Sequence, residues 1–180
     1  MDWREINYST FSNSLFRIFW KKKIINGKII QVKIWNTAGQ ERYKGLTKNY
    51  FRNSDGVIIT YDVTNNYSFE KVHDWIESIF KYNDSEKDIK LVLVGNKIDI
   101  QKRISTEQGE NLAKMYGIPF FESSAKKNIG INDFMQKIIE DVVSNFNYYK
   151  KGINLNNINN RNYINNNSFN DGCMCWQFYF

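Results

Sequence analysis

The stretch Leu91-Val-Leu-Val-Gly-Asn-Lys-Ile-Asp99 joins a continuous apolar run to a polar loop. A short, almost uninterrupted apolar run is typical of a strand covered on both faces, and Val57 to Tyr61 is a second such run. A helix is predicted between the two runs, because one helical face would consist of Phe69, Val72, Ile76, Ile79 and Phe80. Strand, helix and strand in this order favour a parallel sheet.

The flanking sequence extends this pattern in both directions. Upstream, Lys23 to Ile25 and Ile29 to Trp35 flank Asn26-Gly27, a two-residue hairpin signal. Downstream, Ser105 opens a predicted capping box ahead of a second helix, and Ile118 to Phe121 is a predicted strand. A long final helix is indicated by Ile131, Phe134, Met135, Ile138, Ile139, Val142 and Phe146. The predicted fold class is therefore α/β, with a doubly wound, mostly parallel sheet that binds ligands beyond the carboxyl ends of its strands.

Composition and length describe a chain with one main domain. The 180 residues are 42% hydrophobic, which is enough for one core and excludes collagen-like and wholly disordered proteins. We expect an atypical segment at residues 1–19, a domain at residues 20–150 and an Asn-rich flexible tail at residues 151–180. The net charge of +6 suits phosphates, acidic lipid or nucleic acid without choosing among them.

The apolar runs and the cysteines indicate the cellular compartment. No run approaches the roughly 20 residues that a membrane-spanning helix needs, and the N-terminus is unlike a secretory signal. Cys173 and Cys175 are too close together for an ordinary structural disulfide. We therefore expect a protein of the reducing cytoplasm. A zinc site is not expected, because His73, the only histidine, lies far from both thiols in the sequence.

The loop after Leu91 to Val94 has the chemistry to select a purine base. A carboxylate at Asp99 can accept two parallel hydrogen bonds from guanine N1–H and the N2 amine, which adenine does not offer. Asn96 would tie neighbouring loops together, and the stem of Lys97 would lie along the base. For Asn-Lys-x-Asp alone, an ordinary polar turn after a strand is the simpler interpretation.

Two other predicted strands end in loops of related chemistry. Glu122-Ser-Ser-Ala-Lys126 follows Ile118 to Phe121, and its small side chains would let backbone N–H groups approach guanine O6. Asn36-Thr-Ala-Gly-Gln-Glu41 follows the predicted hairpin. In this loop the N–H of Gly39 would approach a phosphate, and Gln40 would orient an attacking water. One such loop alone is poor evidence for a nucleotide site, but three such loops after three predicted strands are much stronger evidence.

Together with Tyr50-Phe-Arg and Tyr61-Asp-Val-Thr64, these motifs resemble the small GTPases of the Ras superfamily, and specifically its Rab branch. The motif around Gly39 reads Lys33-Ile-Trp-Asn-Thr-Ala-Gly-Gln-Glu-Arg-Tyr43, and the resemblance covers about residues 20 to 150. It implies a guanine-nucleotide switch that binds GTP, hydrolyses it to GDP and phosphate, and regulates intracellular vesicle traffic.

The resemblance also implies roles for individual residues. Gln40 would be catalytic by positioning the hydrolytic water, and residues from Gly39 to about Thr47 would form a switch that the γ-phosphate orders. Trp35 would either meet effectors or be an ordinary core residue. The residues that would bind the nucleotide are Gly39, Asn96, Lys97, Asp99, Ser124, Ala125 and Lys126.

The implied partners are GTP and GDP, effector proteins, exchange factors and GTPase-activating proteins, with no nucleic acid and a monomeric chain. Mg²⁺ is the implied cofactor, and Asn36 stands where the family has the Asp that holds the Mg²⁺ shell. Cys173-Met-Cys175 resembles the family's geranylgeranylation signal, although five residues follow it. Prenylation there would make the protein peripheral on the cytosolic face of secretory-pathway membranes.

The phosphate-binding loop of the family is not found in these 180 residues. No Gly-x-x-x-x-Gly-Lys-Ser/Thr occurs, and Gly27, the only glycine before Gly39, belongs to the predicted hairpin. Losing three or four charge-assisted phosphate contacts, at about 1.5–3 kcal/mol each, removes roughly 5–10 kcal/mol, or about four to seven decades of affinity. We therefore expect weak GTP binding and little hydrolysis by this chain.

The first strand and first helix of the family are missing together with that loop. In the family this strand lies at the centre of the sheet, between the hairpin and the strand that matches Val57 to Tyr61. Its absence would leave two buried edges unpaired, and the irregular pattern of Ser14 to Trp20 makes that segment a poor substitute. A mistaken or alternative start explains these departures better than a genuine pseudo-GTPase does.

Two other functions compete with a Rab-type GTPase. A nucleic-acid-binding module would use the basic balance, but the lysine pairs are scattered and no recognition motif accompanies them. A non-catalytic Rab-like interaction module would bind effectors without nucleotide cycling. Co-purifying guanine nucleotide would distinguish the GTPase from such a pseudo-GTPase.

Overall fold

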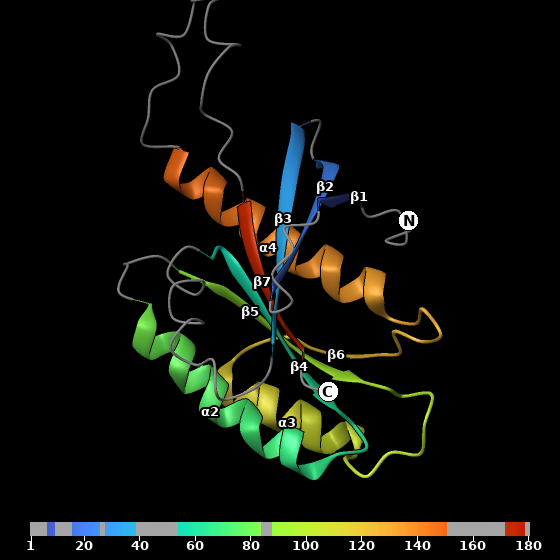
Figure 1. Ribbon diagram of the computed structural model, residues 1–180. Coiled ribbons are helices and arrows are strands. Elements are labelled where there is room, and N and C mark those ends of the chain that lie inside the picture. The colour runs from blue at the N-terminus through green and yellow to red at the C-terminus, as the bar shows by residue number, and fades with distance from the viewer. Residues whose placement is uncertain are drawn as a thin grey trace, which may run out of the picture.

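The computed structural model describes residues 7–9, 16–25, 28–38, 54–83, 88–150 and 172–178, with side chains for 32–35, 54–83 and 88–144. Its strands are β1 (Asn7–Ser9), β2 (Phe16–Ile25), β3 (Lys28–Ala38), β4 (Gly56–Asp62), β5 (Lys90–Asn96), β6 (Phe120–Ser123) and β7 (Gly172–Phe178) (Figure 1). Its helices are α2 (Asn66–Tyr82), α3 (Thr106–Tyr116) and α4 (Ile131–Lys150).

The strands form one sheet in the order β1-β2-β3-β7-β4-β5-β6. The pairs β1–β2 and β2–β3 are antiparallel, whereas every pairing from β3 across to β6 is parallel. Ile25 pairs with Lys28, so the connection between β2 and β3 is two residues long, as the hairpin signal predicts. The predicted α/β fold with a doubly wound, mostly parallel sheet is confirmed.

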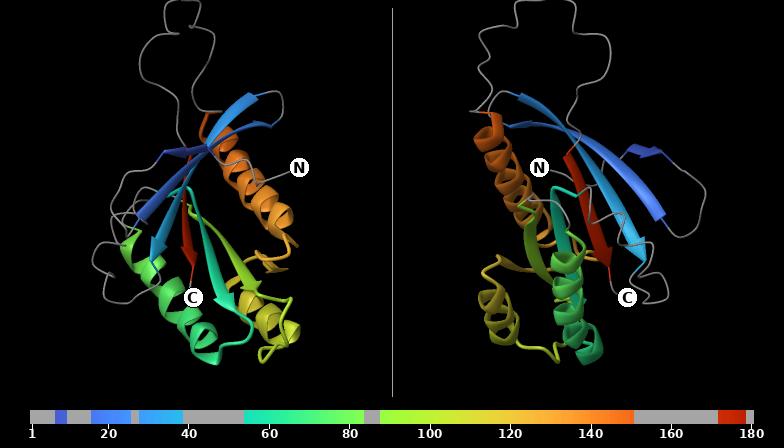
Figure 2. Two further views of the ribbon diagram at one scale, coloured as in Figure 1. Left: turned by 45° about the vertical axis from the view of Figure 1, so that its right-hand side comes forward. Right: turned by 90° about the vertical axis from the view of Figure 1, so that its left-hand side faces the viewer.

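Helices cover both faces of the sheet. Figure 2 shows α2 and α3 on one side of the strands and α4 on the other. Strand β4 is buried along its whole length, which explains its almost continuous apolar sequence. Its side chains alternate between two cores: Val57 and Ile59 pack with α2 and α3, and Ile58 packs with α4.

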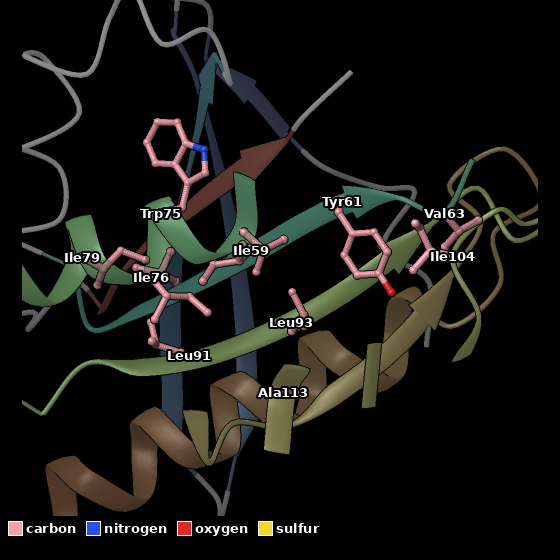
Figure 3. Close-up of a cluster of buried hydrophobic side chains, with 12 residues drawn as sticks. Ile59, Tyr61, Val63, Trp75, Ile76, Ile79, Leu91, Leu93, Ile104 and Ala113 are labelled. Atoms are coloured by element: carbon pink, nitrogen blue, oxygen red, sulfur yellow. The ribbon is translucent and has the colours of Figure 1, made fainter. Parts of the chain in front are cut away.

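Helix α2 presents one apolar face to the sheet. Figure 3 shows Trp75, Ile76 and Ile79 of this helix in one cluster with Ile59 and Leu91 of the strands. The sequence predicted Phe80 on the same face, but Phe80 is 58% exposed, and this prediction was wrong. Position 80 lies at the margin of the helical stripe, and the large side chain of Trp75 fills the core instead.

Side-chain caps fix where two helices begin. The side chain of Asn65 accepts hydrogen bonds from the backbone N–H groups of Tyr67 and Ser68 at the start of α2. At the start of α3, Ser105 and Gln108 form the predicted capping box in both directions. These local signals set the first residue of each helix.

Three segments differ from the sequence-based expectation. Strand β2 begins at Phe16, so the antiparallel hairpin extends into the segment that we expected to lie outside the domain. Strand β6 begins at Phe120 rather than Ile118, because Pro119 has no N–H to donate to a ladder. Gly172–Phe178, expected in the flexible tail, form β7 between β3 and β4. The two edges that we expected to be unpaired are therefore paired with β7, and residues 151–171 lie outside the described residues.

Candidate functional site

The carboxyl ends of β4, β5 and β6 meet in one row. Asp62 of β4 is in register with Asn96 of β5, and Asn96 is in register with Ser123 of β6. Two backbone hydrogen bonds continue the row beyond the strands, from Val63 N–H to Asn96 O at 3.0 Å and from Ile98 N–H to Ser123 O at 3.1 Å. The loops that follow these strands are therefore held side by side, at the edge where parallel sheets bind ligands.

The side chain of Asn96 joins two of these loops. Its Oδ1 atom accepts hydrogen bonds from the Ser123 hydroxyl at 3.3 Å and from the Ala125 N–H at 3.1 Å. The backbone N–H of Ala125, which the sequence suggested as a donor to a base, is thus bonded to Asn96 in this structure. Asn96 holds the position of the β6 loop relative to β5.

Lys97 is fixed by an ion pair with Asp62, the last residue of the neighbouring strand β4. Its backbone has φ of 70°, an uncommon left-handed conformation for a residue with a side chain, and its Nζ lies 2.7 Å from Oδ2 of Asp62. The other carboxylate oxygen of Asp62 accepts hydrogen bonds from the N–H of Thr64 at 2.8 Å and from its hydroxyl at 2.7 Å. Both oxygens of a buried carboxylate are therefore used, and the ammonium group is held at the row of strand ends.

Asp62 stays ionised because its partners outweigh its burial. Burial alone would raise the pKa of Asp62, but the hydrogen bonds from Lys97 and Thr64 and the charge of Lys97 lower that pKa below its ordinary value. The sequence analysis quoted Asp62 within Tyr61-Asp-Val-Thr64 without giving it a role. Only the fold reveals that this carboxylate faces Lys97, since Asp62 ends β4 and Lys97 directly follows β5.

Asp99, the candidate base selector, contacts the β6 loop. Its Oδ1 accepts a hydrogen bond of 2.6 Å from the hydroxyl of Ser124. This bond lowers the pKa of Asp99; partial desolvation opposes it, and the positive charges of Lys126 and Lys127 lower the pKa further. A carboxylate has about four acceptor positions, so the serine bond uses only one of them.

The loop after β6 is closed on itself. Ser124 and Ile129 exchange backbone hydrogen bonds of 3.0 Å in each direction, and the Ser124 hydroxyl accepts a further bond from Lys127 N–H at 3.0 Å. Ala125 and Lys126 are exposed at the tip. The hydroxyl of Ser124 thus connects the turn to Asp99, and the structure brings together six of the predicted base-binding residues: Asn96, Lys97, Asp99, Ser124, Ala125 and Lys126.

Gly130 ends this loop in a conformation that other residues rarely adopt. Its φ is +71°, and a Cβ atom there would lie 2.2 Å from the carbonyl oxygen of Glu122. Gly117 provides a matched control, because it has φ of +64° but no atom within 4 Å of the Cβ position.

We expect Gly130→Ala to destabilise the protein by about 2–5 kcal/mol, since backbone strain and a steric clash add together. Gly117→Ala should cost only about 1–2 kcal/mol, because it brings the strain without the clash. Urea unfolding followed by circular dichroism measures both values. Equal destabilisation by the two variants would show that the close approach of Gly130 to Glu122 adds nothing to the cost in unfolding free energy.

Several predicted site residues are not brought to this row. Gly39 and Gln40 lie outside the described residues. Asn36 lies in β3, where the structure describes its backbone only, and Cys173 and Cys175 lie in β7. Trp35 is half-buried against the core beneath α2 and α3, with Lys33 Nζ 4.8 Å from its ring centroid. A meeting of Trp35 with effectors remains a prediction.

The described side chains do not supply a magnesium site. Within them, no group of three or more His, Cys, Asp or Glu residues is placed to hold a metal ion. The sequence likewise has no P-loop hydroxyl, and Asn36 offers a neutral amide rather than a carboxylate.

None of the helices in the described parts of the chain has the length and apolar character to span a membrane.

Known proteins identify the family. A family model for the Ras family matches residues 7–144. Ras-related protein Rab-8A of Bos taurus is 38% identical over 120 residues, which cover 66% of this chain and 57% of Rab-8A. Ras-related protein SEC4 of Saccharomyces cerevisiae is 41% identical over 123 residues, or 66% of this chain and 56% of SEC4. Ras-related protein RabC of Dictyostelium discoideum is 36% identical over 135 residues, or 74% of this chain and 68% of RabC.

The extent of these matches decides what they establish. The chain spans less than two thirds of the length of Rab-8A and of SEC4. The Ras-family match nevertheless covers well over half of this chain and includes the three strands whose ends form the row. The chain therefore belongs to the Ras family, as a Rab-type small GTPase.

Proposed function

We propose that this chain binds guanine nucleotides at the loops after β4, β5 and β6 and acts as a GTP-dependent switch in vesicle traffic. The observation that supports the proposal is a set of three contacts between loops: Lys97 with Asp62, Asn96 with Ala125, and Ser124 with Asp99. Because these contacts hold the loops in place before a ligand arrives, little ordering is needed on binding.

Base selection is assigned to the carboxylate of Asp99. The pKa of Asp99 is lowered, so at neutral pH the group is an anion that accepts hydrogen bonds and donates none. Guanine offers two adjacent donors to such a group, whereas adenine offers an acceptor at N1. The stem of Lys97 would lie along the base, since its ammonium group is already held by Asp62. Ser124, Ala125 and Lys126 would close around the base from the β6 loop.

Hydrolysis would depend on residues outside this row. Gln40 is our candidate for orienting the attacking water, and Gly39 for a backbone contact with the γ-phosphate. Ras-family GTPases generally use Mg²⁺, and Asn36 is our candidate for a hydrogen bond to a metal-bound water. An amide forms a weaker bond of this kind than a carboxylate does.

The similarity to Rab proteins does not favour the alternative of an interaction module without nucleotide cycling.

The partners and the location follow from the family. We propose GTP and GDP as ligands, with effectors, exchange factors and GTPase-activating proteins as protein partners. Lipid attachment at Cys173 and Cys175 would place the protein on the cytosolic face of secretory-pathway membranes. The chain would act as a monomer.

The test is whether the loops distinguish guanine from adenine. In ¹H–¹⁵N spectra of the chain, we expect GDP to shift the amide signals of Ile98 to Ile100 and of Ala125 to Lys127. ADP at the same concentration should leave these signals in place, because adenine does not offer Asp99 two adjacent donors. NMR detects millimolar binding, so the experiment works even when the phosphates contribute little. Equal shifts with GDP and ADP would contradict base selection by this site.

A further inference from the structure

Strands β3 and β4 lie in the middle of the sheet and do not pair with each other. The space between them is as wide as one strand, or about 10 Å between the two backbones. Both borders are buried, with Val32 2% and Ile34 3% exposed in β3 and every residue buried in β4. An empty space would leave two rows of backbone N–H and C=O groups without partners in the core.

The C-terminal segment occupies this space. All seven residues of β7 pair in parallel with β3, from Gly172 opposite Val32 to Phe178 opposite Ala38. On its other side β7 pairs in parallel with β4, from Met174 opposite Gly56 to Gln177 opposite Ile59. Figure 2 shows β7 lying between β3 and β4. A short tail segment therefore provides hydrogen-bond partners for two buried edges.

The sequence of β7 suits a central strand. Gly-Cys-Met-Cys-Trp-Gln-Phe contains no charged residue and no proline, and it follows the Asn-rich residues 153–167. Cys175 stands opposite Trp35 on one side and Val57 on the other. Val57 belongs to the core beneath α2 and α3, and Trp35 packs against that core, so Cys175 stands in register with two residues of the sheet's interior.

We infer that the space between β3 and β4 is a strand-binding site whose occupant is Gly172–Phe178, and that binding there withholds Cys173 and Cys175 from chemical modification. The two cysteines are the second and fourth residues of β7: Cys173 has a partner on β3, and Cys175 has a partner on both β3 and β4. The lipid part of this inference rests on the proposed function; the strand-binding part does not.

Lipid attachment and strand binding exclude each other. In prenyl transfer a cysteine thiol loses its proton, its sulfur forms a thioether bond to C1 of a prenyl diphosphate, and diphosphate leaves. The sulfur must enter the active site of another enzyme for this reaction, so the segment has to leave the sheet first. The same residues thus hold the tail either in the sheet or at the membrane.

Thiol reactivity tests the inference directly, because Cys173 and Cys175 are the only cysteines of the chain. The full chain is treated with N-ethylmaleimide, and modification is followed by mass spectrometry under native conditions and in guanidinium chloride. We expect both thiols to react at least about 100-fold more slowly in the native chain. Reaction of the native thiols at the denatured rate would overturn the inference.

A proline pair locates the protection. Met174→Pro removes a backbone N–H from the middle of β7, whereas Asn166→Pro places the same residue in the Asn-rich stretch as a control. Met174→Pro should raise the native reaction rate towards the denatured one, and Asn166→Pro should leave it unchanged. Equal rates in both variants would contradict strand binding. If Met174→Pro fails to fold, the native-to-denatured ratio of the unchanged chain still decides. The GDP and ADP spectra fail or succeed independently of these rates.

Discussion

Adding a strand–P-loop–helix segment in place of residues 1–15 is expected to raise the affinity of the chain for GTP by about four to seven decades. The base loops are already joined to one another, through Asn96 to Ala125 and through Asp99 to Ser124. The chain lacks the Gly-x-x-x-x-Gly-Lys-Ser/Thr sequence whose backbone N–H groups and lysine would contact the phosphates. Fluorescence titration with a labelled GTP measures the gain.

Two controls separate the phosphate contacts from other effects of the added segment. Replacing the P-loop lysine with alanine should remove much of the gain in affinity but leave the preference for guanine over adenine unchanged. The added strand should also compete with β7, because both would pair with β3 and β4. We therefore expect Cys173 and Cys175 to react faster in the extended chain. An extended chain that folds and binds GTP no better than the original would show that the phosphate contacts are not what limits binding.

The parts of the fold that were predictable are those that local sequence determines. Strand β4 has an apolar residue at nearly every position because both of its faces are covered, and that pattern is visible without any partner. The start of α3 follows from Ser105 and Gln108, which interact within one helical turn. The hairpin between β2 and β3 follows from its two-residue connection.

The unpredicted features depend on contacts between distant segments. The sequence of Gly172–Phe178 does not indicate that its neighbours are β3 and β4, so we expected the segment to belong to a flexible tail. In the site, Asn96 and Asp99 could be found from the chemistry of one loop. Asp62 could not, since its role depends on the left-handed backbone of Lys97 and on the register between β4 and β5.

Asp99→Asn in the extended chain is expected to lower the preference for GDP over ADP by about 100-fold. The asparagine amide replaces one acceptor oxygen with an NH₂ donor, and that donor would face the N1–H and N2 amine of guanine. Xanthine has a carbonyl oxygen at C2 in place of the amine, so the variant should bind xanthosine diphosphate better than the unchanged chain does. A gain for xanthine cannot come from a loss of folding. Competition titrations with the three nucleotides measure these changes.

Asp88→Asn is the matched control for Asp99→Asn. Asp88 precedes β5 at the amino end of the sheet, where its carboxylate pairs with Lys90 at 2.5 Å, so the same substitution there should not alter base preference.

The lowered pKa of Asp99 predicts the pH profile as well. An ordinary aspartate titrates near pH 3.9, so the unchanged chain should keep its guanine preference down to about pH 5 and lose it only in stronger acid, as Asp99 is protonated. A preference for guanine that survives Asp99→Asn would remove the basis for assigning base selection to this carboxylate.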